Sequence, residues 1–475
     1  MALKGLPQGY SPYPASARQV PGATAALVRG PQGKRLFLSS PVPGFSGEEL
    51  SAGGRLCPLS WPNARALGRL LPEFRPRRLP SGPSFGFGDR VGLAAPGHLR
   101  ALAGAQVFPV LAQQSVRENT RTGRTFDDVL AAAVFGAFQE GYSGGFAADA
   151  DHLKSVEDAA CAARLGYTFF TCDPSSHIVA AADRFSDEEL ARRFADLPQA
   201  AEYRKAFLGK DISVDGLGRL RFSERDLARA AVKYGRAVEF AASMWAALAD
   251  LLPGGFDYEV SVDETDSPTT PLEHFFIVGE LQRRGVELSC LAPRFGGAME
   301  KGVDFRGSVE VFRRDLRAHM AIAKVMGGYR ISLHSGSDKF SLYPVFHQEG
   351  GGRWHVKTAG TSYLVALRVV AERSPDLFRE IAALSLANFS EERATYHLSA
   401  DRGRVVPPTD LPDGELPRLL EQEDSRQVLH VAFGAVLTSP LGEKLRAVLE
   451  AHEEEHYAAL ARHLGRHLQA LGVKA

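Results

Sequence analysis

Short apolar runs alternate with longer amphipathic stretches from about residue 83 onward. Eight of these runs have the length and composition of buried strands, and stretches with helical periodicity lie between them. Thr125 and Ser186, each followed by acidic residues, are typical helix starts. Eight strand–helix units over about 290 residues predict an α/β fold, a (β/α)8 TIM-type barrel, with a doubly wound sheet as the alternative. We predict the strands at residues 87–93, 106–112, 144–150, 167–172, 256–262, 287–292, 329–334 and 354–358.

The remaining segments predict additions to this barrel. Residues 1–80 are rich in Gly and Pro and hold one hairpin-like pair, which predicts an N-terminal β-rich decoration covering one barrel end. The catalytic barrel is expected to span residues 81–372. Its segment 176–255, after the fourth strand, predicts a helical insertion. Residues 373–475 predict a C-terminal helical extension.

Composition limits the classes of function. Hydrophobic residues make up 44% and charged residues 24% of the 475 residues, as in ordinary folded proteins. Lys and Arg total 56, as do Asp and Glu, so no excess positive charge favours a nucleic-acid partner. No apolar stretch approaches the roughly 20 residues that span a membrane, and the N-terminus lacks the pattern of a secretion signal. The four cysteines have no CxxC spacing. We therefore expect a cytoplasmic protein with reduced thiols and no membrane partner.

Side chains with the chemistry of metal ligands lie where two predicted strands end. Asp151 and His152 close the third strand, and His334 closes the seventh. Because the active sites of (β/α)8 barrels lie at the carboxyl ends of the strands, we expect these side chains to meet at one rim. A single histidine at such a position is more often a hydrogen-bonded core residue. The hypothesis of a metal site therefore depends on the two histidines and the aspartate occurring together. Imidazole nitrogen and carboxylate oxygen are ligands that Zn, Mn, Ni and Co accept.

The fifth predicted strand carries an acidic stripe. Glu259, Ser261 and Asp263 alternate with valines, and Glu264 follows directly. A strand with two buried faces normally reads as a continuous apolar run, so the stripe predicts a polar barrel interior near a site. Burying such groups without partners would be too costly.

Positive side chains lie near the same predicted rim. Lys339 follows the seventh strand, Lys357 lies in the eighth, and Arg117 and Arg294 follow the second and the sixth. Lysine and arginine at a site favour a substrate with an anionic group.

A second histidine pattern does not predict a site. Residues 452–456 match HExxH, the zinc-protease motif, but no later ligand loop completes such a site. Together with His463 and His467, we interpret this pattern as the solvent-facing stripe of a terminal helix.

Several longer blocks resemble one family. The chain carries QQSVRENTRTGRTFDDV, ADADHLK, SVDETDSPTTPLEH, APRFGGAMEKGVD, SLHSGSDKFSLYP and HVKTAGTSY. These blocks resemble the metal-dependent tagaturonate epimerases, which interconvert D-tagaturonate and D-fructuronate and include members acting on tagatose and fructose. The resemblance runs from about residue 87 to about residue 470, and the first 80 residues carry no matching motif.

The resemblance implies one divalent cation, which we expect to be Zn, Mn, Ni or Co. Carried over by motif, His152 and His334 are expected to bind it. Asp304 is the expected third ligand, with Glu300 and Asp263 as rivals.

The resemblance also implies an acid and a base. Asp151 is expected to be the base and Glu264 the acid, with Glu259 as the rival for the acid. Lys339 is the first candidate for binding the substrate carboxylate, and Lys357 and Arg117 follow it.

The implied reaction limits the mechanism. The two uronates differ at C4 of the hexulose chain, a carbon β to the ketone, so proton exchange beside the ketone cannot invert it. We favour a retro-aldol route over hydride transfer, because the chain shows no loop to hold a nicotinamide. The alternatives are a metal-dependent sugar isomerase or aldolase, and a sugar-binding barrel protein without catalysis. A small sugar or sugar acid is the expected partner, and a homo-oligomer is compatible with the sequence.

Overall fold

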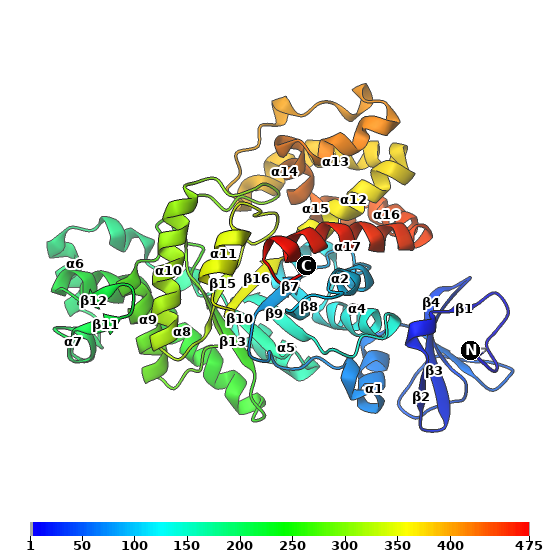
Figure 1. Ribbon diagram of the computed structural model, residues 1–475, viewed down its shortest axis with the longest axis horizontal. Helices are drawn as coiled ribbons and strands as arrows, with labels where there is room; N and C mark the ends of the chain where they lie inside the picture. The colour runs from blue at the N-terminus through cyan, green and yellow to red at the C-terminus, as the bar shows by residue number, and fades with distance from the viewer. Residues whose placement is uncertain (1–2, 475) are drawn as a thin grey trace.

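A closed barrel of eight parallel strands forms the centre of the computed structural model, which describes residues 3–474 (Figure 1). Strand β16 pairs with β7 and closes the ring. The predicted (β/α)8 barrel is confirmed, and closure excludes the open doubly wound sheet. In chain order the strands are β7 (Ser84–Phe87), β8 (Phe108–Ser115), β9 (Ala147–Leu153), β10 (Phe169–Cys172), β13 (Asp257–Ser261), β14 (Cys290–Ala292), β15 (Arg330–Leu333) and β16 (Trp354–Thr358).

The first barrel strand lies earlier in the chain than predicted. Strand β7 ends at Phe87, where the predicted strand began. The backbone then turns, and the Asp89 carboxylate accepts the N–H groups of Gly92 at 2.7 Å and Ala94 at 2.8 Å. Val91 is buried in this turn. Its apolar character therefore reflects packing of a loop and not strand pairing.

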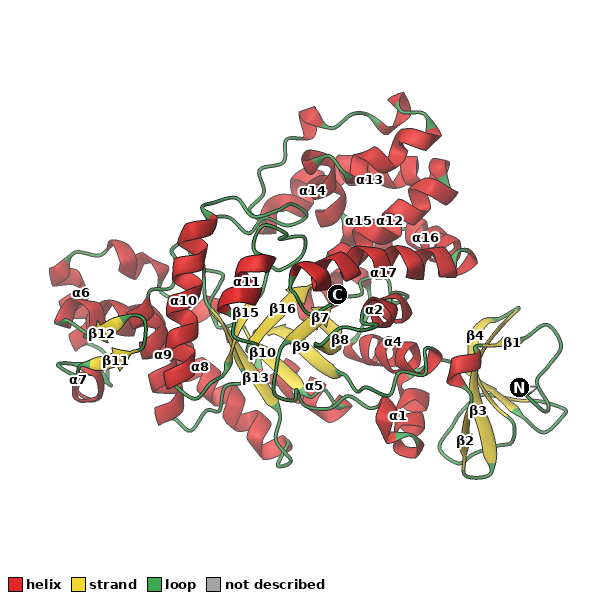
Figure 2. Cartoon of the chain, viewed as in Figure 1, coloured by secondary structure: helices red, strands yellow, loops and turns green. Residues whose placement is uncertain are grey.

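Helices follow the strands and surround them (Figure 2). The predicted helix starts are confirmed: the Thr125 hydroxyl accepts the N–H of Asp128, and Ser186 accepts that of Glu189 at the start of α6 (Asp187–Ala195). These caps satisfy backbone groups that a helix leaves unpaired. The helices around the barrel are α2 (Ala95–Ala101), α3 (Val116–Thr122), α4 (Phe126–Gln139), α5 (Val156–Leu165), α8 (Glu224–Leu251), α9 (Pro271–Arg283), α10 (Val309–Val325), α11 (Tyr343–Glu349) and α12 (Thr361–Arg373).

The N-terminal segment forms a six-stranded antiparallel sheet followed by α1 (Trp61–Leu70). Lys34 donates to Gln139 of α4 at 2.7 Å and to Tyr457 of α17 (Glu453–Ala470) at 2.6 Å. The sheet thus packs against outer helices (Figure 1), which corrects the expectation that it covers a barrel end. Its strands are β1 (Ser11–Pro12), β2 (Arg18–Val20), β3 (Ala23–Gly30), β4 (Gly33–Leu38), β5 (Glu48–Glu49) and β6 (Arg55–Cys57).

The other additions are mainly helical. Between β10 and β13, helices α6 and α7 (Ala200–Phe207) precede α8, with a short hairpin, β11 (Ile212–Val214) and β12 (Gly218–Leu220), that the sequence did not predict. Within residues 3–474, no helix is both long enough and apolar enough to cross a membrane. The C-terminal extension holds α13 (Pro375–Glu392), α14 (Glu423–Val431), α15 (Phe433–Leu437), α16 (Pro440–Ala451) and α17.

Two histidines of helix α17 are buried and do not face solvent. His456 is 1% exposed and His467 is fully buried, because α17 folds back against α2 and α12. The interpretation of a solvent-facing stripe is therefore wrong for these two residues. His452, at the start of the helix, keeps a side chain that is 35% exposed.

Asp338 joins the loop after β15 to the C-terminal helices. Its side chain is buried, and its backbone has a left-handed φ of 56°. Its Oδ1 lies 2.8 Å from His463 Nε2 on α17, and its Oδ2 accepts a bond from Arg426 of α14 at 3.0 Å. Its backbone N–H donates to His467 Nε2 at 3.2 Å. These bonds attach two helices of the extension to the rim of the barrel.

We expect Asp338→Ala to lower the free energy of unfolding by about 3 kcal/mol, because it leaves the buried His467 and the half-buried Arg426 and His463 without their carboxylate. Chemical denaturation followed by circular dichroism measures this loss. Asp376→Ala is the matched control, since the Asp376 side chain is 97% exposed and pairs with Arg379 on its own helix. Asp376→Ala should lower the free energy of unfolding by less than about 1 kcal/mol. Equal losses in the two variants would contradict the anchoring role of Asp338.

Candidate active site

Lys357 on β16 is buried in the barrel interior among three carboxylates. Its Nζ lies 2.8 Å from Asp149 Oδ2, 2.8 Å from Asp151 Oδ1 and 3.0 Å from Glu259 Oε1, and it donates to Thr171 Oγ1 at 2.7 Å. Burial opposes the charge on Lys357, but Asp149 and Asp151 outweigh it and hold the pKa of the lysine well above its ordinary value. The acidic stripe on β13 therefore does face a polar interior.

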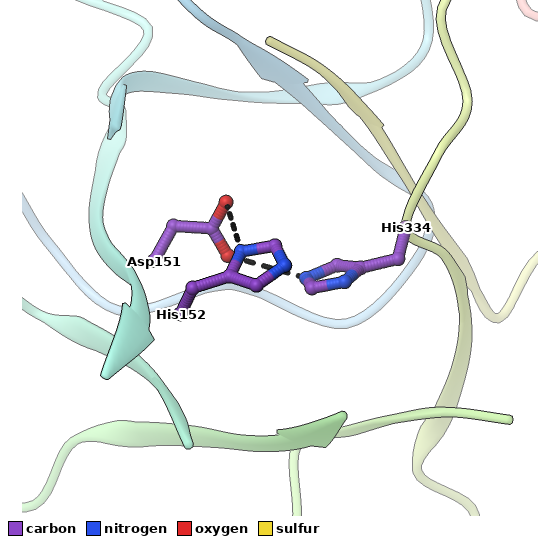
Figure 3. A group of neighbouring side chains, drawn as sticks. All are labelled: Asp151, His152 and His334. Carbon is purple, nitrogen blue, oxygen red and sulfur yellow. Dashed lines mark hydrogen bonds and ion pairs between the residues drawn. The ribbon is translucent and has the colours of Figure 1, made fainter. Parts of the chain in front are cut away.

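Asp151, His152 and His334 lie together (Figure 3), and Asp151 also contacts Lys357. His152 Nδ1 lies 3.1 Å from Asp151 Oδ2, and His334 Nε2 lies 3.2 Å from Asp151 Oδ1. The two imidazole rings stack with centroids 4.3 Å apart. Consecutive residues of a regular strand point to opposite faces. The left-handed φ of His152, 52°, breaks this alternation, so both Asp151 and His152 reach the site.

The charges of this group depend on one another. Burial alone would raise the pKa of Asp151, but Lys357 and His152 hold it well below its ordinary value. Burial and Lys357 oppose a charged His334, whereas Asp263 and Asp151 outweigh both and raise the pKa of His334 to about 10. These shifts favour the ionised form of Asp151 and the protonated form of His334 when no metal is bound.

Both candidates for the acid lie beside a histidine. Glu259 is fully buried on β13, and its Oε1 is 3.3 Å from His334 Nε2. Glu264 follows the strand, has a side chain that is 38% exposed, and places Oε1 3.8 Å from His152 Nε2. Asp263 Oδ1 lies 3.3 Å from His334 Nδ1. Glu259 therefore contacts His334 from within the barrel interior, while Glu264 lies on the solvent side of His152.

Two adjoining hollows lead from this group to the surface. The inner chamber is lined by the Asp151–His152–His334 group, and the outer hollow, of about 530 Å³, reaches Glu264. Arg117, Lys301 and Tyr396 line both. The Arg117 guanidinium lies 5.1 Å from the centre of the Tyr396 ring, and Lys301 Nζ donates to Ser335 Oγ at 2.9 Å. The outer volume suits a small organic ligand with an anionic end.

The structure does not bring Asp304 into this group. Its Oδ1 accepts a bond from Ser341 Oγ at 2.9 Å, and its Oδ2 accepts the Ser341 N–H at 3.1 Å. Glu300 is also engaged elsewhere, since its Oε2 accepts bonds from the C-terminal extension. The expectation of Asp304 as third ligand is thus corrected. Of the two rivals, Asp263 contacts His334 and Glu300 does not.

Two lysines expected to bind substrate have no free donor. Lys339 Nζ donates to the carbonyl oxygens of Glu300 at 2.9 Å, Val303 at 2.6 Å and Ser337 at 3.1 Å, which uses all three N–H groups. Burial lowers the pKa of Lys339 to about 8. Lys357 is occupied in the same way by the interior carboxylates. Both lysines line the inner chamber, but their N–H groups are engaged in holding the loop and the interior in place, so their binding of substrate stays a prediction.

Three lining residues were absent from the sequence prediction of substrate contacts. Lys301 lies within the APRFGGAMEKGVD block, but its position there does not show which way its side chain points. Tyr396 and His430 come from the C-terminal extension, more than thirty residues beyond the last barrel strand. Only folding of the extension over the rim brings them to the chamber.

The Asp151–His152–His334 group fits a divalent metal. Ligand atoms held about 2.0–2.2 Å from one ion lie about 3 Å apart, and the observed separations of 3.1 and 3.2 Å match this spacing. His152 Nδ1 is buried and, although it lies 3.1 Å from Asp151 Oδ2, it forms no well-directed hydrogen bond within the described chain. The surrounding carboxylates outnumber the one buried lysine, so added positive charge is favourable.

A second group, Asp338 with His463 and His467, has similar composition. Its atoms are already used: His467 Nε2 accepts a backbone N–H, and Arg426 donates to the carboxylate. It fits a structural network better than a metal site.

Comparisons with known proteins agree on one family. A family model described as tagaturonate epimerase (UxaE) matches residues 13–471. The chain is 44% identical over 471 residues to a tagaturonate/fructuronate epimerase of Thermotoga maritima, with 98% of this chain and 97% of that protein covered. It also resembles crystal structures of fructuronate-tagaturonate epimerase UxaE from Cohnella laeviribosi, native and with glycerol, with a TM-score of 0.93, 36% identity, and 98% and 97% of the two chains covered.

We expect His152→Ala and His334→Ala each to lower the metal content of the purified protein, because each removes one nitrogen ligand. Elemental analysis after dialysis measures the content. Chelation of the unaltered protein should abolish turnover, and a divalent cation should restore it. His452→Ala, a half-exposed histidine outside both hollows, is the control and should keep its metal. Full turnover by a sample shown to be free of metal would contradict the metal site.

Proposed function

The chain belongs to the tagaturonate epimerase family, and we propose that it interconverts D-tagaturonate and D-fructuronate by inverting C4 of the hexulose chain. It is thus an isomerase-class enzyme. The observation that supports this reaction most directly is the convergence of Asp151, His152 and His334 at the carboxyl rim of the barrel. D-tagatose and D-fructose differ at the same carbon, so we include them as candidate substrates.

The proposed route is retro-aldol cleavage followed by aldol addition. A base takes the proton of the C4 hydroxyl, the C3–C4 bond breaks, and C4 becomes an aldehyde. The bonding electrons move onto C3 and the C2 ketone as an enediolate. Rotation about C4–C5 presents the other face of the aldehyde, the C3–C4 bond forms again, and an acid returns the proton. No atom or electron is gained or lost, so no external oxidant is needed.

We assign the proton transfers to two carboxylates. Asp151 lines the inner chamber and is held in position by Lys357, so it is placed to accept the C4 hydroxyl proton. Glu264 faces the outer hollow beside His152 and is placed to return a proton. A bound divalent cation would be held by His152 and His334, with Asp263 or Asp151 as oxygen ligand, and would stabilise negative charge developing on the ketone oxygen.

Arg117 and Lys301 are the residues we propose for binding the substrate carboxylate. Lys301 uses one N–H on Ser335 and has two more to offer, and within the described chain Arg117 forms no ion pair. Burial lowers the pKa of Lys301, which an incoming carboxylate would oppose. This pair replaces Lys339 in the role predicted from the sequence.

The function is tested with purified protein and each divalent cation in turn, offered tagaturonate, fructuronate, tagatose and fructose. We expect turnover of both uronates. Asp151→Asn, assayed at saturating divalent cation, should lower kcat by roughly 10² to 10⁴-fold, because the amide keeps the shape and loses the proton acceptor. Cleavage of the substrate to stable three-carbon products, without epimer, would favour an aldolase instead.

The choice of acid is tested by two further amide variants. We expect Glu264→Gln to reduce kcat by a similar factor, since it removes the proposed proton donor. Glu259→Gln removes a carboxylate that contacts His334 and Lys357. We therefore expect it to lower the free energy of unfolding more than it lowers kcat. An active Glu264→Gln enzyme alongside an inactive but folded Glu259→Gln enzyme would exchange the two roles.

Lys301→Met is expected to lower kcat/KM on tagaturonate about ten- to a hundredfold and to affect tagatose much less. A hydrogen bond to a charged group contributes roughly 1.5–3 kcal/mol, and tagatose has no carboxylate to receive it. Steady-state kinetics on both substrates give the ratio. Lys339→Met is the matched control, because its amino group bonds only backbone carbonyls and should affect both substrates alike. Equal losses in Lys301→Met would place the carboxylate elsewhere.

A further inference from the structure

His430, on α14 of the C-terminal extension, is a buried residue of the inner chamber whose ring has no partner. It is 1% exposed, and it lines the chamber together with Asp151 and His334. Neither ring nitrogen has a hydrogen-bond partner within the described chain. A buried polar atom without a partner costs free energy, so such an atom facing a chamber indicates a ligand.

The ring of His430 is held in one position by its neighbours. A β-carbon at Gly360, just before α12, would overlap the His430 ring. The ring therefore packs directly against the backbone of Gly360. The carbonyl oxygen of His430 accepts a bond from Arg90 at 3.2 Å. Arg90 is itself fixed by an ion pair of 2.8 Å with Glu118 and by the Phe433 ring, 3.8 Å from its guanidinium carbon. These contacts fix the backbone of His430 and place its ring against Gly360.

The surroundings of His430 keep its ring neutral. Burial, Arg90 and Lys301 all lower its pKa, which lies well below the ordinary value of histidine. A neutral imidazole offers one N–H donor and one nitrogen acceptor. A hydroxyl group can satisfy either of them, because it both donates and accepts. A carboxylate can satisfy only the donor.

We propose that His430 binds a hydroxyl group of the sugar acid and so contributes to substrate affinity from outside the barrel. This inference rests on the proposed function, because it takes the polyhydroxy chain of the uronate as the ligand. It gives the C-terminal extension a direct part in recognition. His430 contacts the substrate but needs no proton transfer in the reaction.

A second histidine supplies the matched control. His456 on α17 is also 1% exposed, and both its ring nitrogens also lack partners within the described chain. It lines neither the inner chamber nor the outer hollow. Removing either ring costs packing, but only removal of the His430 ring should change substrate binding.

The test compares His430→Phe, His430→Gln and His456→Phe in the full-length enzyme with its metal. We expect His430→Phe to raise KM for tagaturonate by roughly five- to a hundredfold with a smaller change in kcat. Calorimetric titration with an equilibrated mixture of the two uronates should show the same loss in Kd. His430→Gln keeps a donor and an acceptor and should recover most of the affinity, and His456→Phe should bind as the unaltered enzyme does.

The outcomes separate this inference from the proposed function. An unaltered enzyme that turns over neither uronate would overturn the function. Turnover by the unaltered enzyme together with normal KM and Kd in His430→Phe would overturn only the role of His430. If His430→Phe does not fold, His430→Ala decides: normal KM and Kd in the folded His430→Ala protein would overturn the role of His430.

Discussion

One lysine buried among carboxylates determines how the barrel interior is built. Lys357 on β16 contacts Asp149 and Asp151 on β9 and Glu259 on β13, so its charge connects three strands. Removing it would leave several buried acids unpaired, which costs far more than the loss of a surface ion pair. The same contacts fix the carboxylate that we assign as the base. Stability of the interior and placement of the reactive group therefore depend on one side chain.

A single lysine cannot neutralise this many acids. Burial raises the pKa of Asp149 to about 7 against the pull of Lys357, and the neighbouring acids Asp151 and Glu259 add to the rise. The carboxylates around His334 raise its pKa in the same way and favour a proton on its ring when no metal is bound. An imidazole must lose that proton to bind a metal, so protons and metal ions compete for this position. The deficit of positive charge is what makes the rim suitable for a divalent cation.

The sequence predicts the barrel and the histidine–aspartate group well, because both follow from local pattern. Strand alternation gives the fold, and residues at strand ends must share one rim, which places Asp151 and His334 together. Prediction from the sequence is less informative in loops, because spacing along the chain does not determine which way a side chain points there. Lys339 and Lys301 both line the chamber, but Lys339 spends its N–H groups on three carbonyl oxygens, whereas Lys301 donates to Ser335. Asp304 turns to Ser341 for the same reason.

The C-terminal extension explains why the rest of the site is invisible in the sequence. The loop after β15 begins with His334 and continues to Asp338, whose carboxylate and N–H contact α14 and α17. The position of a proposed metal ligand is therefore coupled to helices about a hundred residues away in the chain. Helix α14 supplies both Arg426, which holds Asp338, and His430, which faces the chamber. One helix thus contacts the loop that carries His334 and also supplies part of the chamber wall.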